Sequence, residues 1–227
     1  MNSSPPGLNV LDLGGMRPIG EGLNFLTHAM GLLLSLTGAI ALMRVIWPSD
    51  EPWQAFGCGV YAASLVTVYG ASTLSHAFHR PELRHFFRRL DQACIFLLIA
   101  GSYTPWGIHY YRDGWGGVLL LAMWSLALVG ALVKWFVKGH NNIATACYVM
   151  LGWMPLLAIK PMLERVPAAG LGWLLTGGLL YTLGTWFLNR DVRFPYYHAV
   201  WHLMVIAASV CHFAGVMLYV VPEATRG

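Results

Sequence analysis

Apolar segments of about 20 residues follow one another through most of this chain, and they constrain its fold more than any other feature. A helix needs about 20 apolar residues to cross a hydrocarbon core roughly 30 Å thick. Because no water is available there to bond the backbone, a spanning segment of this length is expected to be helical. The seven segments are approximately 23–47, 53–79, 91–111, 115–137, 143–162, 168–188 and 196–221.

The composition agrees with a chain that lies largely in a membrane. Charged residues make up 11% of it and hydrophobic residues 57%, whereas soluble domains carry roughly 25% charged residues. Seven segments with short connections leave no room for a separate soluble domain. The sequence therefore predicts an all-α integral membrane protein, with a single seven-helix transmembrane bundle at 21–222 and short tails at 1–20 and 223–227.

The positive charges predict how the bundle is oriented. The N-terminal tail and the connections after the second, fourth and sixth segments hold nine Lys and Arg residues, against five on the other side. Short cytoplasmic loops carry the excess of Lys and Arg, so the N-terminus is expected in the cytoplasm and the C-terminus outside. The net charge of +4 reflects this bias, and it does not indicate nucleic-acid binding.

Two histidines four residues apart, His198 and His202, open the last segment. Residues with this spacing lie one turn apart on one face of a helix, where their imidazoles can bind a single metal ion. Polar groups are costly in hydrocarbon, so such a pair favours a function. A single histidine in a membrane helix is more often a packing residue, and the pair alone does not decide between the two interpretations.

Three further polar residues are predicted at the same depth as this pair. Ser72 and His76 lie four residues apart at the cytoplasmic end of the second segment, and Asp91 begins the third. Three imidazoles with an open position are a common arrangement for catalytic zinc. We therefore predict a Zn²⁺ site with ligands His76, His198 and His202, and with Ser72 and Asp91 as the catalytic partners of the water that zinc would activate.

A second group of polar residues opens the first segment, where Glu21, Asn24 and His28 follow a spacing of three and four and share one helix face. One interpretation is an outer hydrogen-bonding layer that holds the histidine ligands or the connection after the second segment. The other is an ordinary helix start, with Glu21 favourable at the positive end of the helix dipole and Asn24 buried in a helix contact. Direct metal binding by His28 is not predicted.

Four motifs in this order resemble one family. They are E-x-x-N-x-x-T-H in the first segment, S-x-x-x-H at the end of the second, LDQACIFLLIAGSYTPW in the third and HAVWHLMVIAASVCHF in the seventh. Together they resemble the bacterial hemolysin-III family, which is related to the progestin and adipoQ receptors, including adiponectin receptors, and more distantly to alkaline ceramidases. The resemblance covers nearly the whole chain. It implies zinc on His76, His198 and His202, with Ser72 and Asp91 beside it, in a multi-pass protein of the bacterial cytoplasmic (inner) membrane.

Three functional hypotheses follow. The first is a zinc-dependent, ceramidase-like hydrolase that cleaves an amide or ester of a membrane lipid, with Asp91 relaying the proton. The second is a sensor or regulator of membrane lipids in which zinc is structural. The third is a cytolytic pore, as the family name suggests. A pore should have polar stripes along several spans, whereas the polar residues here gather at one depth. A membrane lipid is therefore the expected substrate or ligand.

Overall fold

Every regular element among the residues that the structure describes is a helix. A computed structural model describes residues 19–112, 114–137, 141–191, 193–194 and 196–225. The predicted N-terminal tail at 1–20 lies largely outside this range, whereas only residues 226–227 of the predicted C-terminal tail at 223–227 do. The elements are α1 (Ile19–Ile46), α2 (Pro52–Ala77), α3 (Pro81–Tyr111), α4 (Trp115–Phe136), α5 (Asn141–Trp153), the 3-10 helix η1 (Met154–Ala158), α6 (Ile159–Arg165), α7 (Ala168–Leu188), α8 (Tyr197–Gly215), the π-helix η2 (Val216–Val220) and α9 (Val221–Ala224).

Six of the predicted segments form helices that are long and apolar enough to cross a membrane. They are Gly20–Ile46, Pro52–Ala77, Trp115–Phe136, Ile143–Arg165, Ala168–Leu188 and Tyr197–Val220. The remaining predicted segment, 91–111, is also helical and forms the later part of α3. Because every backbone group of a helix except those at its ends is bonded within the helix, these elements can lie in hydrocarbon without loss of hydrogen bonds.

The helix α3 begins well before the apolar segment that it contains. The sequence predicted a basic loop between the second and third segments, but α3 starts at Pro81, and Arg84, Arg88 and Arg89 all lie in its first turns. Proline suits the first turn of a helix, where the backbone N–H that it lacks would have no partner. Hydropathy marks only the part of a helix that hydrocarbon can surround, so it places the start of α3 too late.

The fifth predicted segment is not one continuous helix. The α-helix ends at Trp153, a 3-10 turn follows over Met154–Ala158, and α6 resumes the α-helical path. Pro155 lies in the first turn of this 3-10 helix. A proline removes one backbone hydrogen bond and clashes with the preceding turn, which accounts for the break.

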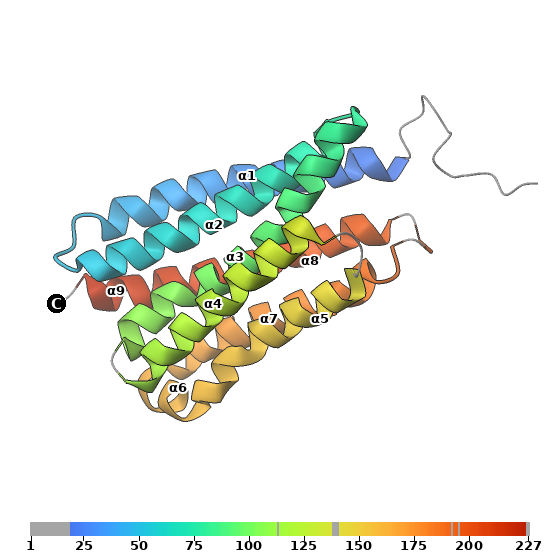
Figure 1. Ribbon diagram of the computed structural model, residues 1–227. Coiled ribbons are helices and arrows are strands. Elements are labelled where there is room, and N and C mark those ends of the chain that lie inside the picture. Colours follow the sequence, from blue (N-terminus) through green and yellow to red (C-terminus); the bar gives the residue numbers. More distant parts are fainter. Residues whose placement is uncertain (1–18, 113, 138–140, 192, 195, 226–227) are drawn as a thin grey trace, which may run out of the picture.

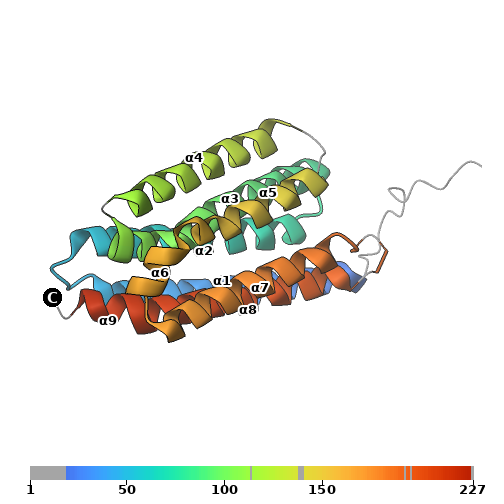
Figure 2. The ribbon, with the colours of Figure 1, turned by 90° about the horizontal axis from the view of Figure 1, so that it is seen from below.

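The helices form a bundle whose first and last members are neighbours (Figure 1). The closest pairs are α1 with α2, α2 with α3, α3 with α4, and α7 with α8, while α8 also packs against α1. Figure 2 shows α4 on the opposite side of the bundle from α1, α7 and α8. The start of α1, the end of α2 and the start of α8 lie at one end of the bundle in Figure 1, and α9 lies at the other.

The α2–α3 contact depends on a glycine. A Cβ atom at Gly101 would lie 2.5 Å from the Ser64 hydroxyl oxygen and 2.9 Å from its Cβ. Small residues of this kind let membrane helices approach closely. The close approach holds α3, and with it Asp91, against the helix that carries Ser72 and His76.

We expect Gly101→Ala to destabilise the protein by about 1–3 kcal/mol, because the added methyl group overlaps Ser64. Thermal unfolding of the purified protein in detergent measures the loss. Adding Ser64→Gly should restore much of the stability by removing the overlapping atoms. Gly59→Ala is the control, since its Cβ would meet only Met43 Cε at 3.9 Å. Equal losses at both glycines would contradict this account of the contact.

Candidate metal centre

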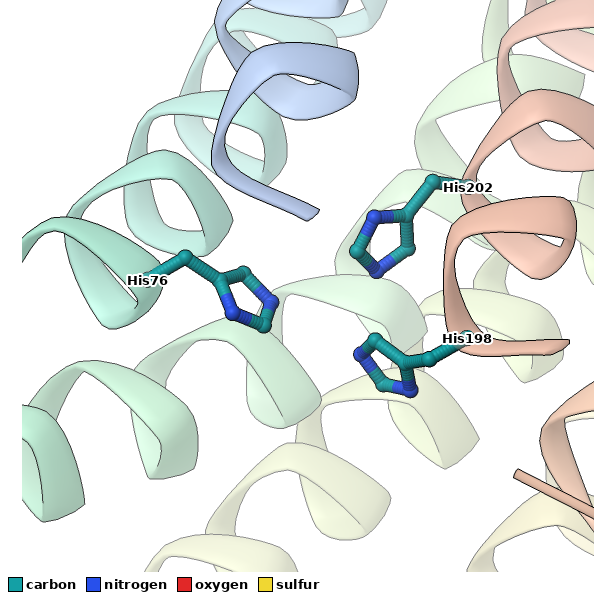
Figure 3. A group of neighbouring side chains, drawn as sticks. All are labelled: His76, His198 and His202. Carbon is teal, nitrogen blue, oxygen red and sulfur yellow. The ribbon is translucent and has the colours of Figure 1, made fainter. Parts of the chain in front are cut away.

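Three histidines predicted as ligands from the sequence lie together at one end of the bundle. His76 comes from the last turn of α2, while His198 and His202 come from the first turns of α8. One candidate ligand atom from each residue lies within 4.8 Å of the others. Figure 3 shows His76 facing the other two rings across the space between the helices. This arrangement could hold one metal ion.

The Nδ1 atom of each of the three rings has a hydrogen-bond partner. The Nδ1 of His76 lies 2.9 Å from Glu21 Oε2, and that of His198 lies 2.7 Å from Asp191 Oδ2. A metal-binding histidine usually donates its other N–H to a carboxylate or a carbonyl, which fixes the ring and makes it a better ligand. The Nε2 atoms of these rings are therefore left for a metal.

The third ring, that of His202, is held by a hydroxyl group. Its Nδ1 lies 3.0 Å from Thr27 Oγ1, and the Thr27 hydroxyl donates to the carbonyl of Leu23 at 2.9 Å or of Asn24 at 3.0 Å. Since the threonine proton is used on the backbone, the oxygen can accept a hydrogen bond from Nδ1–H. His202 is only 1% exposed, and its Nε2 is then unprotonated, as metal binding requires.

Glu21 joins this cluster to α3. Its Oε1 accepts a hydrogen bond from Arg84, and the guanidinium of Arg88 lies 3.9 Å away. One carboxylate of α1 thus contacts both a histidine at the end of α2 and the basic first turns of α3. These are the contacts that the outer-layer interpretation requires of Glu21, whose role in metal binding stays a prediction.

The predicted catalytic pair lies beside the histidines. Ser72 is one turn before His76 on α2 and is 1% exposed, and its hydroxyl donates to Asp91 Oδ2 at 3.1 Å. Both residues line the same cavity as the three histidines. The other Asp91 oxygen is not used in this bond.

The two remaining residues predicted for the outer layer are buried near the cluster. The His28 ring lies against that of His202, with ring centroids 3.7 Å apart, but His28 is not part of the group that could hold a metal. Asn24 is 6% exposed, and its Oδ1 has no hydrogen-bond partner among the described residues. Neither residue contacts the histidines in the way that Glu21 does.

Sequence reasoning missed one residue of the cluster, Asp191, and left another without a partner. Thr27 was recognised among the polar residues that open the first segment, but it lies beside the face shared by Glu21, Asn24 and His28, and no partner was assigned to it. Asp191 precedes His198 by seven residues, in the connection between α7 and α8. An acidic residue in the connection that leads into a His-x-x-x-His helix is the signal that could have identified Asp191.

A cavity of about 990 Å³ begins at this cluster and runs between α3, α5, α7 and α8. At the histidine end its wall includes Ser72 and Asp91, and elsewhere the wall is mostly apolar. The cavity reaches Met162, Ala168 and Leu171, which lie toward the opposite end of the bundle. A space of this length and character fits a hydrocarbon chain.

Comparison with known proteins connects these features to one group. The family model described as haemolysin-III related matches residues 17–213. The chain belongs to the haemolysin-III family. The resemblance predicted from the four sequence motifs is thereby confirmed, and the chain is a multi-pass integral membrane protein of haemolysin-III type.

Individual relatives of the haemolysin-III chain come from bacteria and animals. It is 36% identical over 203 residues to "Hemolysin-3" of Bacillus cereus, covering 89% of this chain and 92% of the relative. It is 28% identical over 202 residues to the human "Monocyte to macrophage differentiation factor", covering 86% and 82% of the two chains. It is 26% identical over 228 residues to the Drosophila melanogaster "Adiponectin receptor protein", covering 85% of this chain and 49% of the receptor.

We expect the purified protein to carry a metal that the combined His198→Ala and His202→Ala variant lacks, because two of the three ligands are removed. Asp191→Ala should retain the metal with an affinity about 10–100-fold lower, since the His198 ring loses its support. Elemental analysis and competition with a chelator measure both effects.

Glu82→Ala is the control for Asp191→Ala, because Glu82 is an exposed carboxylate at the same end of the bundle. It should leave the metal affinity unchanged. The same metal content in the wild type and the double histidine variant would contradict the assignment of the ligands.

Proposed function

We propose that this protein is a zinc-dependent hydrolase that cleaves an amide or ester bond of a membrane lipid. One observation carries the proposal: three histidines with ligand nitrogens within 4.8 Å of one another, next to the Ser72–Asp91 pair, form the polar end of a long apolar cavity. The three-histidine donor set fits zinc, and it leaves a coordination position open for catalysis.

Each residue of the cluster has a part in this reaction. His76, His198 and His202 would hold the zinc ion, which when bound activates a water molecule and polarises a carbonyl oxygen. Asp91 uses one carboxylate oxygen to accept the Ser72 hydrogen bond, and the other is available to take a proton from the attacking water. Asp91 then returns that proton to the departing nitrogen or oxygen, as the bond from the carbonyl carbon to that atom breaks and a fatty acid is released.

The cavity supports a lipid substrate that enters from the bilayer. Leu156, Leu163 and Leu175 line the cavity, and each is exposed. These residues come from η1, α6 and α7, so the cavity approaches the lipid-facing surface between these elements. An acyl chain could thus lie along the cavity while its carbonyl group meets the zinc ligands.

We expect the metal-loaded protein to hydrolyse lipid amides or esters, and Asp91→Asn to lower kcat by about 10²–10⁴-fold while the metal content stays the same. The asparagine keeps the shape of the side chain but cannot carry a proton. Release of fatty acid measures the rate, and elemental analysis measures the metal.

Glu82→Gln is the control for Asp91→Asn, and it should leave the rate of fatty-acid release unchanged. If metal-loaded protein hydrolyses no class of lipid while His76→Ala lowers the thermal stability, the proposal of a hydrolase is contradicted. The second hypothesis, a lipid sensor or regulator with structural zinc, is then favoured. In that alternative a structural zinc ion ties α2 to α8, in addition to the hydrogen bond between Tyr69 of α2 and Ser209 of α8. The protein would then regulate or sense membrane lipids.

We also propose that all seven segments cross the bacterial inner membrane, with the metal centre on the cytoplasmic side. The part of α3 from 91 to 111 would be the seventh span. Arg80, Arg84, Arg88 and Arg89 lie at the same end of the bundle as the histidines, which favours a cytoplasmic location for that end. The N-terminus would then be cytoplasmic and the C-terminus outside.

We expect a membrane-impermeant maleimide to label Asp50→Cys in intact spheroplasts and Glu82→Cys only after the membrane is opened. Both positions are exposed, and they lie at opposite ends of α2 and its neighbours. Mass shift on a gel measures the labelling. Labelling in the reverse order, or of both positions from outside, would contradict the orientation.

A further inference from the structure

Arg88 lies at the polar end of the cavity but has no role in the mechanism above. It belongs to the first turns of α3, lines the cavity, and its side chain is 48% exposed. Its guanidinium is 3.9 Å from Glu21 Oε1, and the other oxygen of Glu21 contacts His76. Only one carboxylate therefore separates this guanidinium from a candidate zinc ligand.

The hydrogen-bond donors of Arg88 are not used within the described part of the protein, whereas the guanidinium groups of Arg84 and Arg89 each have a partner. Arg84 donates to Glu21, and the Arg89 guanidinium lies over the ring of Trp135, 5.6 Å from the ring centroid. No hydrogen bond joins Arg88 to another described residue. A guanidinium offers five N–H donors in a planar fork that matches a carboxylate or a phosphate.

The carboxylates near Arg88 already have other partners. Glu21 bonds to His76 and Arg84, Asp91 to Ser72, and Asp191 to His198. A second cation, Lys134, also lines the cavity and is 8% exposed. Buried and partly buried cations are costly in a membrane protein, and they usually mark a place where a ligand or ion binds.

We propose that Arg88 binds an anionic group of the lipid substrate, a carboxylate or a phosphate close to the acyl linkage. The substrate class is then an acyl lipid whose head group is negatively charged. The acyl chain fills the apolar cavity, the carbonyl group meets the histidine cluster, and the anion lies on the guanidinium at the polar end of the cavity. Arg88 is thus a specificity-determining residue. This inference rests on the proposed function for the placement of the chain, but binding tests it without turnover.

The test compares two ligands that differ only in charge, N-palmitoylglycine and N-palmitoylethanolamine. Both have the same chain and the same amide, but only the first has a carboxylate. Equilibrium binding to the full-length protein in nanodiscs of zwitterionic lipid gives the Kd of each. We expect the wild type to prefer N-palmitoylglycine by roughly tenfold or more, since a hydrogen bond to a charged group contributes about 1.5–3 kcal/mol.

Arg88→Gln should lose this preference by weakening the binding of N-palmitoylglycine alone. Arg89→Gln is the matched control, because it removes the same charge one residue away on a side chain that packs on Trp135. It should keep the preference. Thermal unfolding checks that both variants are folded, and Arg88→Lys, which keeps the charge, should restore part of the preference.

Three results would overturn the proposal: no preference in the wild type, an equal loss in both glutamine variants, or no binding of either compound. An equal loss would mean that only the general positive charge of this end attracts the anion. A preference that depends on Arg88 in a protein that hydrolyses neither compound would support this inference and count against the hydrolase. Hydrolysis of both compounds without a difference in their Kd would support the hydrolase and count against this inference.

Discussion

Polar side chains that lie within a membrane protein need partners, and this requirement organises the end of the bundle that holds the histidines. Each of the three candidate ligands has its Nδ1 bonded to a different residue, and these partners come from α1 and from the connection before α8. Glu21 extends the same network to α3 through Arg84. The positions of α1, α2, α3 and α8 at this end therefore depend on one another.

Much of the fold could be predicted from the sequence because hydrocarbon restricts what a chain can do. Length and apolar composition identified every long helix. The pattern does not locate helix ends that project beyond the apolar region, so the start of α3 at Pro81 was missed. A single proline hardly changes the length or the apolar composition of a segment, so the 3-10 turn at Pro155 inside the fifth segment was not predicted.

The candidate site was predictable as far as depth and helix spacing could carry it. His76, His198 and His202 were identified because each lies near the same end of its segment, and the structure brings them together. The contacts of Asp191 and Thr27 with the histidines could not be predicted in this way. The first depends on the path of a connection, and the second on how α1 is rotated about its axis relative to α8. Arg88 was counted as a topology signal, and only its place in the cavity wall gave it a separate role.

The histidine cluster joins the beginning of the chain to its end. Its outer partners Glu21 and Thr27 and its first ligand His76 belong to the first two helices, whereas His198 and His202 belong to the last long one. Membrane helices are synthesised from the N-terminus onward, so the cluster lacks His198 and His202 until α8 has been made and inserted. A chain that stops before α8 has no site at all. Any metal that the cluster holds through all three histidines would therefore bind only after α8 has been inserted.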